Sequence, residues 1–161
     1  MDPKQTVFLA QTEIIDALAA CENNISLLYH EFSQLVPEMR DFWNCMSHAE
    51  KIHATMLLSM HKLLDSGYIL FGIGRFNQNL IRELDSYVCQ ELRNCEEKAI
   101  FSKYALSVAI KIESSLIDSH FYEITTSDAP QFIIVANHMR NESASHLHAL
   151  QAKMSGNTHK V

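Results

Sequence analysis

The amino-acid sequence predicts an all-α domain, a four-helix bundle made of two helical hairpins joined by a long crossover. Two observations indicate this class. The four glycines and three prolines of the 161-residue chain, the residues that interrupt helices most strongly, gather at a few places. Between these places apolar residues recur at three- and four-residue steps, the spacing of one helical face, and no stretch alternates like a strand. A single domain, residues 1–161, is long enough to bury a core without disulfides.

The first helical pair is expected over residues 6–66. Nothing interrupts a helix between Thr6 and about Leu35. Pro37, followed by the acidic Glu38, is typical of a first helical turn, where proline has no hydrogen bond to lose and a carboxylate faces the positive end of the helix dipole. A second helix should therefore begin at Pro37 and run to the end of the pair.

A crossover is expected over residues 67–93, because three of the four glycines lie within its first eight residues. Inside it, residues 77–92 are expected to form a shorter helix. The second helical pair is expected over residues 94–154, with Pro130 opening its second helix. A short polar tail completes the chain.

The two pairs repeat one spacing. Glu22 precedes Glu50 by 28 residues and Glu113 precedes Glu142 by 29, with a proline inside each interval. Each of these glutamates lies on a helical stripe whose other members are mostly apolar. Two related hairpins packed about a pseudo-twofold axis would therefore bring the carboxylates together in the interior.

Buried carboxylates need compensating positive charge, because an unpaired ionised carboxylate is costly to bury. Glu50 and His53 are three residues apart, so they share a helix face and can reach one metal ion. In the second pair Glu142 is followed by His146. Carboxylates combined with imidazoles suit iron or manganese. The sequence therefore predicts a buried di-metal site.

These features resemble the ferritin-like superfamily, and within it the rubrerythrin and bacterioferritin branch, over about residues 13–153. In that family one glutamate from each of two helices and a Glu-x-x-His motif from each of the other two bind two irons. The resemblance implies a ferritin-like fold, with Glu50 and Glu142 bridging the ions. The full set of metal ligands it implies is Glu22, Glu50, His53, Glu113, Glu142 and His146.

The chain departs from the family pattern in its last helix. Ser145 takes the position three residues after Glu142, and His146 follows one residue later. This offset would turn the second imidazole to the other side of its stripe, so we expect one tight and one weak metal site. Lys51 follows Glu50 where a methionine would resemble the haem ligand of bacterioferritin, so no haem is expected.

Three further side chains lie near the expected site. The sequence leaves three roles open for Tyr29: it packs in the core, it donates a hydrogen bond to a ligand carboxylate, or it acts as a catalytic residue that carries an electron. His120 and His138 lie on the inward stripes and are expected behind the ligands, where they would orient them.

The amino-acid composition indicates which classes of binding partner and which cellular location to expect. With 19 acidic and 13 basic residues the net charge is −6, and no basic cluster could follow a nucleic-acid backbone. Neither a signal-peptide pattern nor a long apolar run occurs, so a cytoplasmic protein without membrane contact is expected. The four cysteines form no Cys-x-x-Cys pair, so a rubredoxin module is absent and electrons would come from a separate donor protein.

The resemblance implies redox chemistry at two iron ions, with manganese or mixed metals as alternatives. The reaction would be reduction of peroxide or oxidation of ferrous iron, which makes the chain a candidate oxidoreductase. A different class of function stays open: a ferritin-like helical binding or scaffold domain whose metal site is degenerate or purely structural. We expect a homodimer rather than an iron-storage shell.

Overall fold

The computed structural model describes residues 3–68, 78–119 and 129–157, and these ranges are helical with short connections and no strand, which confirms the all-α class. The elements are α1 (Pro3–Leu35), the 3₁₀ helix η1 (Pro37–Met39), α2 (Arg40–Ser59), α3 (His61–Asp65), α4 (Gln78–Glu97), α5 (Ser102–Asp118) and α6 (Pro130–Asn157).

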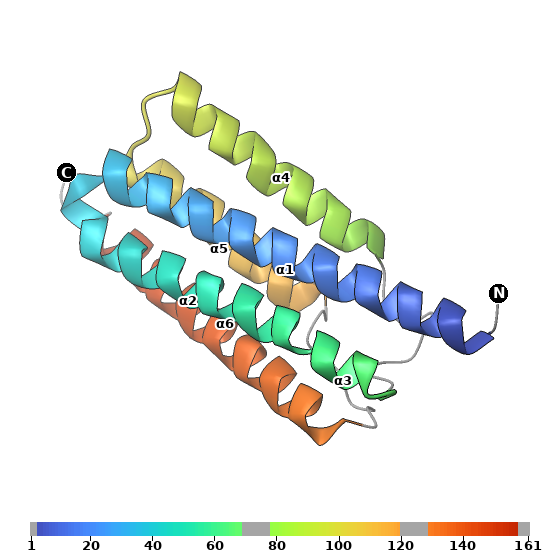
Figure 1. The fold of residues 1–161 in the computed structure, drawn as a ribbon. Helices are drawn as coiled ribbons and strands as arrows, with labels where there is room; N and C mark the ends of the chain where they lie inside the picture. Colours follow the sequence, from blue (N-terminus) through green and yellow to red (C-terminus); the bar gives the residue numbers. More distant parts are fainter. Residues whose placement is uncertain (1–2, 69–77, 120–128, 158–161) are drawn as a thin grey trace.

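Five long helices lie roughly along one direction (Figure 1). α1 and α2 form an antiparallel hairpin through η1, and α5 packs against α6 in the same way. α2 and α6 lie side by side and run in opposite directions, while α4 packs along the outer side of α1. The expected bundle of four helices is therefore not confirmed in that form, because α4, expected as a shorter helix, is 20 residues long.

Two helix boundaries differ from those expected. α4 continues to Glu97 and α5 begins only at Ser102, whereas a new helix was expected from residue 94. The Asn94 side chain donates to Glu91 and accepts from Lys98, and these contacts one turn apart favour continuation of α4 past that point. The expected helix after Pro37 is also divided, because α2 ends at Ser59 and the short α3 follows.

Two serines set the register of the first hairpin. Ser26 Oγ donates to the carbonyl oxygen of Ser47 at 2.8 Å, and Ser47 Oγ donates to the carbonyl oxygen of Ser26 at 2.8 Å. Such reciprocal bonds require the two backbones to approach closely, which only small side chains allow. Since Glu22 lies one turn before Ser26 and Glu50 lies three residues after Ser47, this register brings the two glutamates to the same level.

An aromatic cluster fills the interior on one side of that level. The Trp43 ring lies 5.6 Å from that of Tyr29 and 5.1 Å from that of Phe32, measured between centroids, and all three side chains are fully buried. Tilted and edge-on contacts at these distances are favourable between aromatic rings. The cluster holds α1 against α2 and positions Tyr29 towards α5.

Gly67 closes α3 with a φ of +86°, in the left-handed region that other residues adopt only with strain. We expect Gly67→Ala to destabilise the protein by about 1 kcal/mol, because, chain neighbours aside, no atom of the described residues lies within 4 Å of the added Cβ and only backbone strain acts. Urea unfolding at constant metal content measures this. Gly156→Ala is the control, since Gly156 is helical and also has open space, and it should not destabilise. Equal losses in both variants would contradict the explanation.

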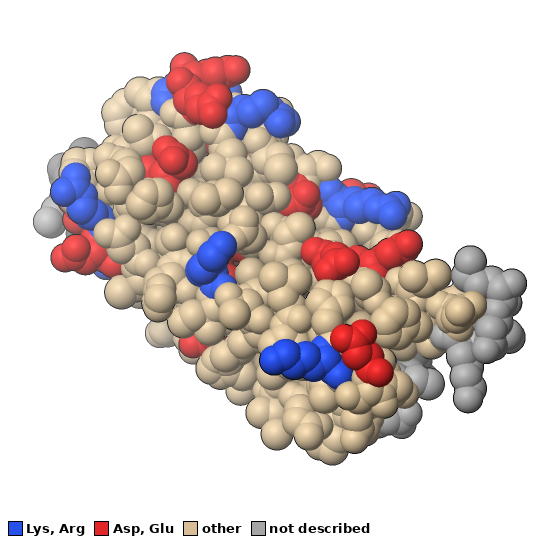
Figure 2. Space-filling view, in the orientation of Figure 1, with Lys and Arg blue, Asp and Glu red and all other residues tan. Residues whose placement is uncertain are grey.

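The surface is mixed in charge. On the face shown in Figure 2, acidic and basic side chains of the described residues are interspersed and separated by neutral ones, so this face presents no continuous basic groove. In the described ranges, no helix has both the length and the apolar character needed to cross a bilayer.

Candidate metal centre

Five of the six ligands predicted from the sequence come together in the interior between α1, α2, α5 and α6. They form two groups of three: Glu22, Glu50 and His53 in one, and Glu50, Glu113 and His146 in the other. Within each group the three potential ligand atoms lie within 4.8 Å of one another. Glu50 belongs to both groups, which is the arrangement that a shared bridging ligand requires.

The first group is held by α1 and α2. His53 Nδ1 lies 2.8 Å from Glu50 Oε2 and 3.9 Å from Glu22 Oε2. All three side chains are at most 1% exposed. Because Glu50 and His53 occupy adjacent turns of one helix face, their contact follows directly from the three-residue spacing in the sequence.

The second group joins α2, α5 and α6. His146 Nδ1 lies 2.9 Å from Glu50 Oε1 and 3.6 Å from Glu113 Oε1. Despite these short distances, Glu50 Oε1, Glu113 Oε2 and His146 Nδ1 lack a suitably directed hydrogen bond within the described part of the chain. Buried polar atoms without such a bond are costly, and electron-pair donors converging in this way suit a cation placed between them.

Tyr29 lies directly behind the second group. Its hydroxyl donates a hydrogen bond to Glu113 Oε1 at 2.9 Å, which is one of the roles that the sequence left open. Burial and the negative charge of Glu113 raise the pKa of Tyr29 well above its usual value, so the phenol stays protonated. It can therefore hold the Glu113 carboxylate in a fixed orientation.

Glu142 belongs to neither group. Its Oε2 atom lies 2.7 Å from His53 Nε2, on the opposite edge of the imidazole from the nitrogen that faces Glu50 and Glu22. The same oxygen lies 3.1 Å from His138 Nε2, and the Glu142 side chain is 37% exposed. The structure therefore places Glu142 behind His53 rather than between the two groups, where the predicted bridging role would require it.

The inward face of α6 is shifted from the predicted stripe. The side chains buried on this helix include Ala136, Met139, Ser143 and Leu150, whereas His138 is exposed. His146 lies at the edge of this face and still reaches Glu50. The residue three positions before His146 is thus Ser143, so the difference from α2 is a missing inward carboxylate and not a displaced histidine. Ser145, which stands three residues after Glu142, is exposed.

Opposing effects act on the titrating groups of the centre. Burial by itself would lower the pKa of both imidazoles, but the short contacts and negative charges of the carboxylates raise it, to about 9 for His53 and about 10 for His146. Burial would raise the pKa of Glu50, yet His146 and His53 outweigh it and bring it to about 2. Burial and the charge of Glu50 raise the pKa of Glu113 to about 7. Without metal, protons on the imidazoles supply the positive charge.

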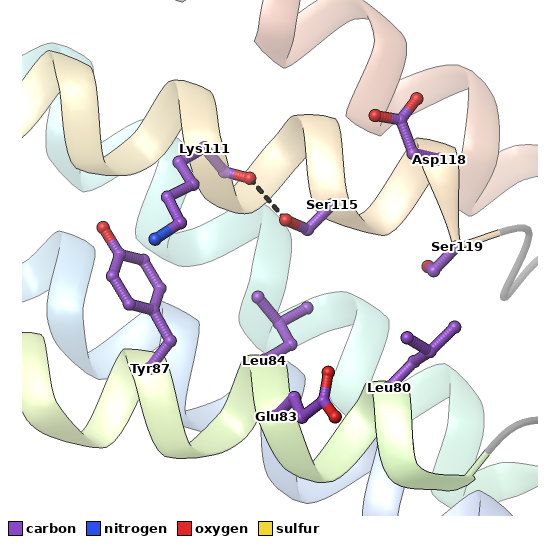
Figure 3. Close-up of a pocket in the computed structure, with 8 residues that line it drawn as sticks. All are labelled: Leu80, Glu83, Leu84, Tyr87, Lys111, Ser115, Asp118 and Ser119. Atoms are coloured by element: carbon purple, nitrogen blue, oxygen red, sulfur yellow. Dashed lines mark hydrogen bonds between the residues drawn. The ribbon is translucent and has the colours of Figure 1, made fainter.

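Open pockets lie on the sides of the bundle, and two of them are relevant to the centre or to α4. One, of about 590 Å³, lies between α2 and α6 and is lined by side chains that include His48, Met56, His138 and Glu142. It leads from solvent to the carboxylate that contacts His53. The other, of about 480 Å³, lies between α4 and α5, where Lys111 stacks on the Tyr87 ring (Figure 3). None of the candidate ligands lines this second pocket.

We expect Glu142→Ala to weaken binding of one metal ion about 10- to 100-fold, because a carboxylate on the far nitrogen of a ligating histidine fixes its tautomer and ring orientation. Equilibrium titration with Co²⁺ measures the loss. His61→Ala is a suitable control, since His61 makes a similar 2.8 Å contact with Asp16 at the surface, away from the centre. Abolition of both metal sites by Glu142→Ala would instead support the bridging role.

Of the remaining sequence predictions, His120 lies outside the described residues. His138 contacts Glu142, and its ring lies edge-on to that of His53 with 6.4 Å between centroids, but it supplies no ligand atom to either group. Ser143 was missed, because a serine among apolar residues carries no signal of its own. Its role could have been suspected only by aligning His146 with His53 and asking what stands three residues earlier. No family model, no curated protein and no solved structure matches this chain.

Proposed function

We propose that the chain is a ferritin-like di-metal carboxylate protein of the rubrerythrin kind, which holds two iron or manganese ions and uses them to reduce peroxide or to oxidise ferrous iron. The observation that carries this proposal is Glu50, which is fully buried and shared by two groups of ligand atoms. The four helices α1, α2, α5 and α6 that supply the ligands correspond to the bundle, and α4 is then an addition on its outer side.

The residues present fit such ions. Glu50 Oε1, Glu113 Oε2 and His146 Nδ1 are buried without a suitably directed hydrogen bond among the described residues, and all three can donate an electron pair to a cation. Carboxylate-rich sites with imidazoles suit iron and manganese more than copper or a structural zinc ion. One ion would be held by Glu22, Glu50 and His53, and the other by Glu50, Glu113 and His146.

In peroxide reduction the bound ions would supply the electrons that the peroxide accepts, and in the alternative reaction ferrous ions would themselves be oxidised. The protein would control the access of small molecules to the centre and the movement of protons. The pocket between α2 and α6 admits small molecules as far as Glu142 and His138. Glu142 orients His53, and Tyr29 orients Glu113. Because the imidazoles must lose their protons when metal binds, the centre exchanges protons for metal ions and keeps its buried charge low.

Stopped-flow mixing of the anaerobic ferrous protein with peroxide and, separately, with dioxygen tests the reaction. Fast oxidation by peroxide alone supports peroxide reduction, and fast oxidation by dioxygen supports ferrous oxidation. The alternative, a helical binding or scaffold domain, gains support from Ser143, because a carboxylate of the second half is absent from the inward face. Tight metal binding without oxidation by either reagent would favour that alternative.

We further propose that the protein works in the cytoplasm as a homodimer that receives electrons from a separate donor protein. All four cysteines are free thiols, as expected in a reducing compartment, and two of them are buried. Sizing chromatography separates a dimer from a monomer and from a storage shell.

A further inference from the structure

The two halves of the centre differ at one position. On α2, Glu50 stands three residues before His53, and on α6, Ser143 stands three residues before His146. Both pairs place their two members on one helix face. By its spacing to the histidine, Ser143 on α6 therefore matches Glu50 on α2, and α6 carries a hydroxyl where α2 carries the shared carboxylate.

The Ser143 hydroxyl is buried and unsatisfied. Its side chain is 0% exposed, and Oγ has no hydrogen-bond partner within the described ranges. A serine inside a helix commonly satisfies itself by donating to a carbonyl oxygen one turn earlier, as Ser145 does to Asn141 at 3.0 Å. Ser143 does not, so a donor remains available on the face of α6 that carries His146.

The charge of the centre points to what such a donor would contact. Two divalent ions bring four positive charges, whereas Glu22, Glu50 and Glu113 bring three negative ones. The carboxylate of Glu142 contacts His53 and His138 at the edge of the centre, and because its side chain is 37% exposed, solvent screens its charge from the interior. An excess positive charge in a buried site is costly, and an anion is the simplest compensation.

We propose that the metal-loaded centre binds one small monovalent anion of the carboxylate or azide kind in the place of the missing carboxylate, and that Ser143 Oγ donates a hydrogen bond to it. This inference rests on the proposed di-metal function. On this proposal the anion is an exchangeable ligand of the centre, whereas the carboxylate of Glu50 is a permanent ligand that the chain itself supplies. Formate and azide are small enough to serve as probes.

The test uses the full chain loaded with Co²⁺, whose visible absorption reports on its ligands. Metal stoichiometry is measured first, and azide or formate is then titrated into the loaded protein. We expect saturable spectral changes in the wild-type protein, and about tenfold weaker anion binding in Ser143→Ala, because a hydrogen bond to a charged acceptor is lost. Ser145→Ala is the matched control, since this exposed serine bonds only within its own helix, and it should bind the anion normally.

A second variant keeps the proposal falsifiable if Ser143→Ala perturbs packing. Ser143→Glu supplies the carboxylate within the chain, and we expect it to bind Co²⁺ more tightly and to stop responding to azide and formate. Two bound cobalt ions without any anion response, or an equal response in the wild-type protein and Ser143→Ala, would overturn the inference and leave the di-metal proposal intact. Failure to bind cobalt would overturn both.

Discussion

Glu50→Gln is expected to abolish tight binding of both metal ions and to destabilise the metal-free protein by about 3–5 kcal/mol at neutral pH. Glu50 is the side chain common to both candidate ligand groups, so removing its charge affects both metal sites at once. In the metal-free state it lies 2.8 Å from His53 and 2.9 Å from His146. Because both imidazoles carry protons at neutral pH, removing the carboxylate charge leaves two buried cations poorly compensated.

Equilibrium metal titration and urea unfolding with and without metal measure these two effects. Glu91→Gln is the matched control: Glu91 is also a buried glutamate, but it lies on α4 and accepts hydrogen bonds from Tyr104 and Asn94. That variant should lose stability while keeping full metal binding and the full stabilisation by metal. If Glu50→Gln retained one tight metal site, the shared role of this carboxylate would be wrong.

The metal-free protein is expected to lose stability as the pH rises from about 6.5 to about 10. The folded-state pKa of His53 is raised to about 9 and that of His146 to about 10, both from 6.5, so the folded protein holds more protons than the unfolded chain in this window. The stability that these charged imidazoles contribute is fully present below pH 6.5 and is lost as the pH passes through the raised values. Since one pKa unit corresponds to about 1.4 kcal/mol, the loss should amount to a few kcal/mol.

The carboxylates set the acid side of the profile. The raised pKa of Glu113, about 7 against 4.5, acts in the same direction as the imidazoles and lowers stability between those values. The lowered pKa of Glu50, about 2, stabilises the fold above pH 4.5, and this contribution disappears only in strong acid. Urea unfolding of chelator-treated protein at pH 6 and pH 9.5 measures the effect. His146→Gln should flatten the profile, and a metal-free protein equally stable at both values would contradict the protonated imidazoles.

Five of the six candidate ligands predicted from the sequence come together in the structure, and the carboxylates among them could be recognised because charged residues on apolar helix faces are conspicuous. Buried apolar residues surround three of the glutamates on their helices: Glu22 on α1, Glu50 on α2 and Glu113 on α5. The three-residue spacing places Glu50 and His53 on the same helix face. Their convergence follows from helix geometry once the hairpins pack. For these residues, local pattern and tertiary structure agree.

The face of α6 could not be predicted in the same way. Apolar residues are spread around this helix, with Ile134 68% exposed and Met139 fully buried, so the pattern does not define one inward stripe. A stripe that includes Glu142 and one that includes Ser143 are only one residue apart. Packing of α6 against α5 and α2 buries the stripe that includes Ser143. The pattern of apolar residues along α6 does not predict which of the two stripes is buried.

The length of α4 was also underestimated, because its role depends on a partner helix. Asn24 on α1 donates a hydrogen bond to Asp85 on α4 at 2.8 Å, and Tyr104 on α5 donates to Glu91 at 2.6 Å. Such contacts between side chains of different helices leave no periodic signal in the sequence. The first contact holds α4 to α1, and the second holds α4 to α5.

Equilibrium titration of the metal-free protein with Fe²⁺ under anaerobic conditions, in the wild-type form and in Glu50→Gln, tests the central claim most directly. Two ions per chain are expected in the wild-type protein, one bound more weakly because Ser143 offers no carboxylate to the centre. Glu50→Gln should bind neither ion tightly. Absence of tight binding in the wild-type protein, or two sites that survive Glu50→Gln, would contradict a di-metal centre built around Glu50.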